Sequence, residues 1–321
     1  MISAYKGRIK LAGSVNTLAQ LDALKPNLIT DPKAWHGETT DGVAWHIYNG
    51  DSYQTLKQFP DNSFNCVVTS PPYYCLRDYG VDNQIGLEET VDEYVNAISN
   101  VFEQVKRNLK KDGVLFLNIG DTYYSGKGES QGIDRKSSKR RFGLRAVDKS
   151  GGVGVGIKRK TIIGVPWRVA LEMSHRGWIL RSPIIWHRQN HLREVVTDRP
   201  RRSYEYVFMF VKDRKYYFER EFLIKNNIEE DMWSIDARPK ATNEIETAPF
   251  PDKLVERCLA VGCPPDGTVL DPFAGAGTTL RVGVASGRET TGIDLNPRFC
   301  EFMVKELRKF NEGQCILPLI K

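Results

Sequence analysis

The chain has 321 residues, of which 40% are hydrophobic and 27% are charged, a balance typical of a soluble globular protein. No apolar run approaches the roughly 20 residues that a membrane helix needs, and the first residues lack the apolar stretch of a secretory signal. We therefore expect a cytoplasmic protein of one large or two ordinary domains. The six cysteines form no C-x-x-C pair and have no histidine cluster beside them, which argues against a zinc site and against a disulfide framework.

The positive charge is concentrated in one segment. The chain carries a formal net charge of +6, and residues 126–160 hold eleven Lys and Arg against three acids. That segment contributes +8, so the rest of the chain sums to −2. Such clustering favours a segment that binds a polyanion, with a solvated loop that has no partner as the alternative.

Short apolar runs alternate with helical patterns from about residue 45 onwards, after a first segment, 1–44, without sustained periodicity. This alternation predicts an α/β fold with a mostly parallel sheet. The segment 204–219, "YEYVFMFVKDRKYYFE", breaks the order; it predicts a hairpin that turns at "KDRK" and supplies one antiparallel strand. We expect strands over 64–70, 113–120, 178–187, 204–212, 267–271 and 289–295, and helices over 89–110, 165–177, 250–262, 277–287 and 297–310.

The hexapeptide "TSPPYY" at 69–74 follows the apolar run 64–68. Neither proline donates a backbone hydrogen bond, and each fixes its own φ near −65°. The residue before each proline is pushed toward extended geometry as well. The result is a stiff corner at the end of a strand, with carbonyls presented outward beside aromatic rings. An ordinary turn could be built from these residues, so the hexapeptide alone does not assign a function.

A second motif, "GTVLDPFAGAGTTLRVGVASGRETTGID", spans 267–294. It predicts a strand, a glycine-rich turn, a helix and a second strand that ends in Asp294, which lies 19 residues beyond Gly275. An acid at that distance suits hydrogen bonding to ribose hydroxyls. The third glycine of a dinucleotide site and the lysine of a P-loop are both missing, and Asp271 at the turn's entrance would repel phosphate. A ribose without phosphate beside a positive charge describes S-adenosylmethionine; a turn that serves only helix packing is the alternative.

Together, the two motifs resemble those of the DNA amino-methyltransferases, which methylate the exocyclic nitrogen of cytosine or adenine. Their catalytic motif corresponds to Ser70-Pro71-Pro72-Tyr73 and their cofactor turn to Phe273-Ala274-Gly275-Ala276-Gly277. The catalytic motif precedes the turn, as in the circularly permuted β group, and further matches such as "DGVLFLNIGDTYY" extend over most of the chain. The resemblance implies a Rossmann-like S-adenosylmethionine-dependent methyltransferase fold. The expected cofactor residues are Asp51, Ser52, Phe250, Pro251, Asp271, Phe273, Gly275, Gly277, Thr278 and Asp294.

The stiff corner then has a chemical reason. An exocyclic amino group is a poor nucleophile because its lone pair is delocalised into the ring. The carbonyl of Pro71 and the side chain of Ser70 can accept its two N–H protons and aim the lone pair at the methyl group, and the prolines hold that carbonyl still. Tyr73 can stack on the base, which must flip out of the duplex. Serine at the first position resembles the N4-cytosine enzymes more than the N6-adenine enzymes, so we expect N4-cytosine.

The resemblance also divides the chain. Residues 45–124 and 161–187 would form the catalytic part of the methyltransferase domain, and 246–321 its cofactor-binding part. Residues 1–44 would be an extension, 125–160 a mobile basic insertion, and 188–245 a short target-recognition region that contains the hairpin.

Double-stranded DNA is the expected partner, bound first through its phosphates. A cognate restriction endonuclease could act on the same site, and a monomer or weak dimer would suffice. His187 could touch DNA, although a structural role is commoner for a lone histidine beside a tryptophan. Two basic stretches supply the candidate DNA contacts, which are Lys136, Lys139, Arg140, Arg141, Lys158 and Arg159 in the first and Arg188, Arg193, Arg201 and Arg202 in the second.

Three rival functions stay open. A DNA-binding protein without activity would explain the basic segments but neither motif. A methyltransferase that acts on RNA or on a protein amide would carry asparagine in place of Ser70 more often. A dehydrogenase is disfavoured by the missing glycine and by Asp271.

Overall fold

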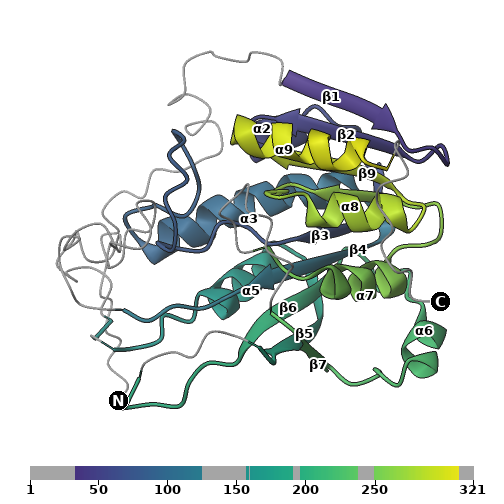
Figure 1. Ribbon diagram of the computed structural model, residues 1–321. Helices are drawn as coiled ribbons and strands as arrows, with labels where there is room; N and C mark the ends of the chain where they lie inside the picture. The colour runs from purple at the N-terminus through teal and green to yellow at the C-terminus, as the bar shows by residue number, and fades with distance from the viewer. Residues whose placement is uncertain (1–32, 125–156, 159, 191–195, 238–248, 311–321) are drawn as a thin grey trace, which may run out of the picture. The chain divides into compact units, whose positions relative to one another are not determined.

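A computed structural model describes residues 33–124, 157–158, 160–190, 196–237 and 249–310. They form one mixed sheet of nine strands with helices on both faces (Figure 1). Within the described residues, no helix is long and apolar enough to cross a membrane. The sheet has the order β1-β2-β9-β8-β3-β4-β6-β5-β7. Its strands are β1 (Lys33–Glu38), β2 (Ala44–Asn49), β3 (Phe64–Thr69), β4 (Leu109–Ile119), β5 (Ile179–Arg188), β6 (Tyr204–Val211), β7 (Met232–Ile235), β8 (Thr268–Asp271) and β9 (Glu289–Asp294).

Seven strands run in one direction, and β1 and β6 run in the other. Strand β1 pairs antiparallel with β2, and β6 lies antiparallel between β4 and β5. Because β6 is reversed, its first residues meet the last residues of β4: Tyr206 lies opposite Ile119. The carboxyl ends of β3, β4, β8 and β9 and the amino end of β6 therefore share one edge of the sheet.

Alternation of side chains along the central strands builds a separate core on each face of the sheet. On β4, Leu115 and Leu117 face one core, while Val114 and Phe116 face the other. All four side chains are fully buried, as expected for a strand that is covered by helices on both faces.

The helices divide between these two faces. Packing places α2, α3 and α5 against the Leu115 side. In Figure 1, α7, α8 and α9 lie over the opposite face, which includes Phe116. The described helices are α2 (Ser52–Leu56), α3 (Val91–Asn108), α5 (Val165–His175), α6 (Arg220–Lys225), α7 (Asp252–Gly262), α8 (Thr278–Ala285) and α9 (Pro297–Arg308).

Local sequence explains where the long helix α3 begins. Thr90 accepts a hydrogen bond from the amide of Glu93, and the Glu93 carboxylate accepts one from the amide of Thr90. This capping box satisfies two amide groups that the first turn leaves unpaired. Apolar residues at helical spacing, Tyr94, Ile98 and Val101 among them, are then buried against the sheet.

The predicted hairpin over 204–219 is wrong. Residues 204–211 form β6, but the chain leaves the sheet after Val211, and residues 216–218 are not a strand. The partners of β6 are β4 and β5, both distant in sequence. The reversed strand was therefore predicted correctly, but its pairing was not. A second reversed strand, β1, and the following β2 begin inside the predicted N-terminal extension.

Candidate active site

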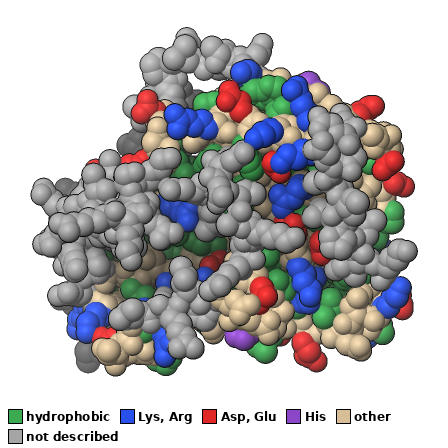
Figure 2. Space-filling model, viewed as in Figure 1, with side chains coloured by type: hydrophobic (Ala, Val, Ile, Leu, Met, Phe, Trp, Pro, Cys, Tyr) green, Lys and Arg blue, Asp and Glu red, His purple; other side chains and the backbone are tan. Residues whose placement is uncertain are grey.

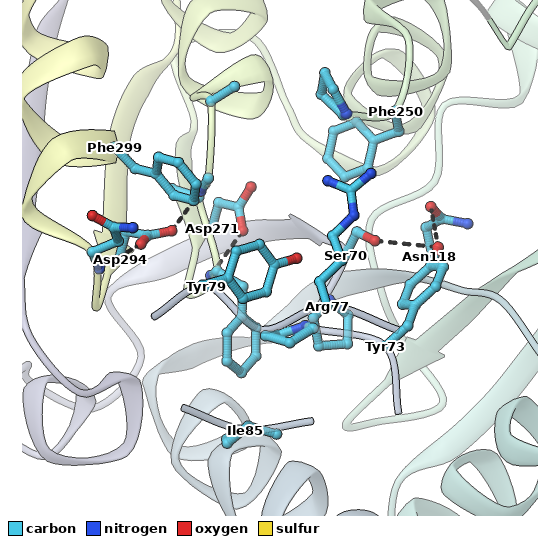
Figure 3. A pocket seen from close by; sticks show the side chains of 18 of the residues that line it. Ser70, Tyr73, Arg77, Tyr79, Ile85, Asn118, Phe250, Asp271, Asp294 and Phe299 are labelled. Carbon is cyan, nitrogen blue, oxygen red and sulfur yellow. Dashed lines mark hydrogen bonds between the residues drawn. The ribbon is translucent and has the colours of Figure 1, made fainter. Parts of the chain in front are cut away.

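A cavity of about 360 Å³ opens at the shared edge of the sheet. Three strands each deliver one of its polar side chains: β3 leads into Ser70, β8 ends at Asp271 and β9 ends at Asp294. In Figure 3, Asp294 and Phe299 lie at one end of the view and Ser70, Tyr73 and Asn118 at the other. Two motifs about 200 residues apart in the sequence thus line one cavity.

The Pro-Pro corner is held by neighbours from α3 and the following loop. The hydroxyl of Tyr94 donates to the carbonyl of Pro72 at 2.8 Å, and the amide of Cys75 donates to the carbonyl of Gly86 at 2.7 Å. Cys75 has φ of 51°, a left-handed conformation, two residues after the Ser70-Pro71-Pro72-Tyr73 tetrad. The corner is therefore fixed on both sides, which suits a preorganised acceptor site.

Tyr73 points into a polar network at the Ser70 end of the cavity. Its hydroxyl lies 3.4 Å from Ser70 Oγ, 3.2 Å from Asn118 Oδ1 and 2.6 Å from Glu205 Oε2. Arg188 Nη1 donates to Glu205 Oε1 at 2.9 Å. Burial, followed by the negative charge of Glu205, raises the pKa of the Tyr73 phenol well above its usual value. Tyr73 is therefore a neutral phenol at physiological pH.

Asp294 organises the opposite end of the cavity. Its carboxylate accepts from the amides of Gly275 and Asn296, each at 2.8 Å. Burial raises the pKa of Asp294 to about 6, against the lowering effect of these two amides. A carboxylate held at a strand end beside a glycine turn is the arrangement that binds ribose hydroxyls.

Asp271 lies in the floor between the two ends and is only 2% exposed. It accepts from Thr69 Oγ1 at 2.7 Å and from the amide of Phe273 at 3.0 Å. Burial is again the main cause that raises its pKa, to about 6. A buried acid that is ionised above that pH offers a complementary charge to a cationic ligand.

The two glycines of the turn have different roles. Gly275 lines the cavity at φ of 52°, and a Cβ added there would meet only the Phe273 carbonyl, at 3.9 Å. A ligand can therefore approach its backbone closely. Gly277, at φ of 76°, begins α8, and a Cβ there would lie 2.7 Å from Met303 Cγ. Gly277 is required for helix packing and is not among the residues that line the cavity.

The other predicted cofactor residues fall mainly around the same cavity. Asp51 caps α2 by accepting from the amide of Gln54, and Ser52 Oγ donates to the carbonyl of Pro272 at 2.5 Å, which ties α2 to the glycine turn. Pro251 lies buried at the start of α7 and, like Gly277, does not line the cavity. The lining includes Asp51, Ser52, Phe250, Asp271, Phe273, Gly275, Thr278 and Asp294.

The predicted DNA contacts are only partly described. Arg188 lines the cavity and pairs with Glu205. Arg202 donates to the carbonyl of Asp121 and lies over the ring of Tyr123, while Arg201 is exposed. Basic and acidic side chains are interspersed over the described part of the face in Figure 2. Lys158 is described, whereas Lys136, Lys139, Arg140, Arg141, Arg159 and Arg193 lie outside the described residues.

His187 has a structural partner. Its Nδ1 lies 3.2 Å from Ser234 Oγ on the neighbouring strand β7. His187 is not among the residues that line the cavity. This hydrogen bond fits the structural role that the sequence allowed for it.

Sequence reasoning missed several residues of the cavity. Arg77 and Tyr79 follow the tetrad within ten residues, and their distance from it in the sequence could have indicated them. Tyr79 also meets Phe299 of α9 edge to face, with ring centroids 6.1 Å apart. Asn118 and Glu205 had no such signal, because only the reversed strand β6 brings Glu205 beside β4. The missed lining residues include Arg77, Tyr79, Asn118, Glu205, Asn296 and Phe299.

The residues at the Asp294 end fit S-adenosylmethionine. The open space at Gly275 admits a ligand to the backbone, and Asp294 can accept from ribose hydroxyls. Phe273 and Phe299 line the cavity beside them and provide apolar surface for an adenine ring. Asp271 supplies negative charge in the floor, toward Ser70, where a sulfonium would be favoured. No part of this set resembles a phosphate cradle.

Comparison with known proteins agrees with this chemistry. A family of N6 and N4 methyltransferases described as DNA methylases matches residues 64–306. The Type II methyltransferase M.Cfr9I of Citrobacter freundii is 37% identical over 268 residues, 82% of this chain and 87% of the relative. M.SmaI of Serratia marcescens is 39% identical over 261 residues, 79% of this chain and 87% of the relative.

Solved structures share the fold. PvuII DNA methyltransferase, named as cytosine-N4-specific, matches with a TM-score of 0.63 at 19% identity, covering 87% of this chain and 96% of its own. A DNA modification methylase of Thermus thermophilus, solved with S-adenosyl-L-methionine, matches with a TM-score of 0.55 at 23% identity, covering 83% and 96%. The chain belongs to the N6/N4 DNA methylase family of S-adenosylmethionine-dependent enzymes.

Proposed function

We propose that this protein methylates the exocyclic N4 of cytosine within a short duplex DNA site, after the base has flipped out of the helix. The observation that carries the proposal is the serine at the head of the tetrad, Ser70, in a cavity that also contains Asp271 and Asp294. Serine at this position resembles the N4-cytosine enzymes. PvuII methyltransferase, which shares the fold, is itself named as cytosine-N4-specific.

The chain's own residues orient the amino group. When bound, S-adenosylmethionine supplies an electrophilic methyl group. Ser70 Oγ and the Pro71 carbonyl accept hydrogen bonds from the two N–H groups of the amine and so direct its lone pair toward the methyl group. Tyr94 holds the corner through Pro72. Phe250 adds a largely buried apolar side chain to the cavity wall.

The base must leave the duplex to reach this cavity, because its amino group is otherwise inside the helix. Stacking on aromatic rings that line the cavity would repay part of the unstacking free energy. The rings that line the cavity include Tyr73, Tyr79 and Trp186. Tyr73 is the stacking residue expected from the family motif, and its hydroxyl is directed to Glu205.

The biological setting proposed is restriction–modification. M.Cfr9I, M.XycI and M.SmaI are all named Type II methyltransferases, and each is at least 37% identical to this chain. A cognate endonuclease that cuts the same unmethylated site is the expected partner. A monomer suffices for this task, since each strand of the site can be modified separately.

Phosphate binding is assigned to the basic residues. The segment 126–160 carries eleven Lys and Arg, enough to neutralise several phosphates. Arg201 is a further candidate, and Lys158 is one of the eleven that lies in the described part of the chain. The region 188–245 is proposed to hold the residues that read the target sequence.

Mass spectrometry of nucleosides tests the proposal. Mixed-sequence DNA rich in short sites is incubated with the protein and labelled S-adenosylmethionine, then digested. Label in N4-methylcytosine is the expected result, and loss of that label with Ser70→Ala at unchanged DNA affinity is the control. Label in N6-methyladenine would contradict the assigned base but keep the enzyme class.

N6-adenine methylation is the second candidate. The family includes both reactions, and adenine N6 presents the same kind of amino group to Ser70. Label in neither base would direct the assay to RNA and to protein amides. DNA binding without any transfer would support a binding protein instead.

A further inference from the structure

Four polar side chains from separate strands surround Tyr73 at the catalytic end of the cavity. Asn118 comes from β4, Glu205 from β6 and Arg188 from β5, while Ser70 follows β3. Of these, Glu205 is the negatively charged member. It accepts hydrogen bonds from Asn118 and Arg188 directly and is linked to Ser70 through the hydroxyl of Tyr73. The methyl transfer described above assigns no role to Glu205.

The chemistry of these groups fixes which of them donates. Glu205 forms an ion pair with Arg188 at 2.9 Å, and a carboxylate can only accept hydrogen bonds. The contact of 2.6 Å between Tyr73 and Glu205 must therefore use the single proton of the Tyr73 hydroxyl. A charge-assisted bond of this length is stronger than the alternative from Tyr73 to Asn118 at 3.2 Å.

The geometry around Ser70 follows from that first bond. Once the Tyr73 O–H donates its hydrogen bond to Glu205, the Tyr73 oxygen can only accept a further bond. Ser70 Oγ, 3.4 Å away, then donates its own single proton to Tyr73. A serine hydroxyl that has donated its proton presents only lone pairs to a substrate.

The rest of the network maintains this direction. Asn118 Nδ2 donates to Glu205 Oε2 at 3.3 Å and to the Tyr206 carbonyl at 3.1 Å. The Asn118 oxygen therefore faces Tyr73 as a second and weaker acceptor, at 3.2 Å against 2.6 Å to Glu205, so the Tyr73 hydroxyl donates to the nearer carboxylate. Burial and the charge of Glu205 raise the pKa of Tyr73, so the phenol keeps the proton that the chain of bonds needs.

We infer that Glu205 is a positioning residue which, through Tyr73, holds Ser70 Oγ as a dedicated hydrogen-bond acceptor for the amino group of the target base. Without it, the serine hydroxyl can turn its proton toward the substrate, where two donors would face each other. The inference rests on the proposed function in one respect, namely that Ser70 meets an amino group. It holds for cytosine N4 and adenine N6 alike.

A double-mutant cycle tests the inference. The variants are Glu205→Gln, Tyr73→Phe and the two combined, and the measured quantity is the single-turnover rate of labelled methyl transfer to DNA. Glu205→Gln and Tyr73→Phe are each expected to slow transfer by about tenfold, the effect of one hydrogen bond to a charged group. Because Glu205 acts through Tyr73, the double variant should be no slower than Tyr73→Phe alone.

Affinities separate positioning from a structural role. Dissociation constants for S-adenosylmethionine and for DNA should stay within about twofold of the wild type in both single variants. Glu289→Gln, which changes an exposed glutamate paired with His46 at the end of β9 away from the cavity, is the matched control and should leave the rate unchanged. A Glu205 that merely braced Arg188 and Asn118 would slow transfer further in the Tyr73→Phe background, and such additivity would overturn the inference.

Two outcomes keep the tests distinct. If Glu205→Gln does not fold, Tyr73→Phe still tests the inference, because it removes the hydroxyl that links Ser70 to Glu205 without removing a charge. An unchanged transfer rate in Tyr73→Phe would overturn the inference. Methylation of adenine by the wild-type protein would contradict the proposed base. The double-mutant cycle would still be measured, from the total label transferred to DNA.

Discussion

Two buried carboxylates at the proposed cofactor site should make the binding of S-adenosylmethionine depend on pH. The pKa values of Asp271 and Asp294 are raised to about 6 by burial, so both acids gain protons as the pH falls through 6. S-adenosylmethionine carries a positive sulfonium and offers ribose hydroxyls as donors, and both favour the ionised carboxylates. We expect the affinity for S-adenosylmethionine to be constant above about pH 7 and to fall by about tenfold at pH 5.

The raised pKa values of Asp271 and Asp294 have the opposite effect on the stability of the protein without cofactor. Each folded-state pKa lies above the ordinary value of 3.8, so each group's contribution to stability is greatest below that value and is lost as the pH rises through 6. Isothermal titration with S-adenosylmethionine and thermal melts from pH 8 to pH 5 measure the two trends. Asp294→Asn should weaken S-adenosylmethionine binding about tenfold and should make both the affinity and the thermal stability less dependent on pH. A pH-independent affinity in the wild type would contradict this account.

Gly277 shows how one residue can limit packing between two helices. Gly277→Ala would force φ of 76° on an alanine and place its Cβ 2.7 Å from Met303 Cγ. Gly287→Ala imposes the same φ of 76° with no atom within 4 Å, so it isolates the backbone strain. In urea denaturation we expect Gly287→Ala to cost about 1 kcal/mol and Gly277→Ala about 2–4 kcal/mol, because overpacking adds to the strain. Equal losses would show that Met303 moves aside freely.

At the scale of elements, Arg176 connects α5 with α3. It donates to Glu172 of α5 at 2.8 Å, and to Asn100 and Asn96 of α3 at 2.7 Å each. A planar guanidinium can make these three bonds together, but a lysine cannot. Arg176→Lys should lower the free energy of unfolding by about 1–2 kcal/mol, measured by urea denaturation. Arg220→Lys, which changes an exposed pair with Glu229, is the control and should cost less than about 0.5 kcal/mol.

Strong local patterns predicted most elements of the fold, and weak ones did not. The buried strands β3, β4, β8 and β9 and the long helices were found near their observed bounds, because each is a continuous apolar run or an amphipathic pattern. The sequence "KAWHGE" of β1 is mostly exposed at the sheet's edge, and β7 has only four residues. Neither carries a periodicity long enough to recognise.

The site divides in the same way. Ser70, Asp271, Gly275 and Asp294 lie in motifs whose residue types state their chemistry, so sequence alone could propose them. Glu205 lies in an ordinary strand pattern. Its place beside Tyr73 depends on β6 running antiparallel between β4 and β5, and the predicted hairpin would have placed β6 against the segment that follows it. Pairing between distant strands is the information that local patterns lack.

At the scale of the whole molecule, the excess positive charge lies in a different part of the sequence from the residues that line the cavity. The described surface in Figure 2 mixes both signs, and the chain outside 126–160 sums to −2. Electrostatic attraction to DNA should therefore depend on that segment more than on the body that holds the cavity. Sequence-independent affinity of this kind depends steeply on salt, because bound phosphates release their counterions.

Deleting residues 130–156 tests this division. The deletion removes seven of the chain's 46 Lys and Arg and two of its acids. We expect weaker DNA binding at low salt and a flatter plot of log affinity against log salt, by about 0.9 for each phosphate that the variant no longer neutralises. Affinity for S-adenosylmethionine should stay within about twofold, since the described lining of the cavity comes from other parts of the chain. Replacing only the seven basic residues of 130–156 by glutamine keeps the length of the chain and should give the same change in slope. Unchanged DNA affinity in both variants would assign phosphate binding to the described body of the protein, with Arg201 and Lys158 as the first residues to test.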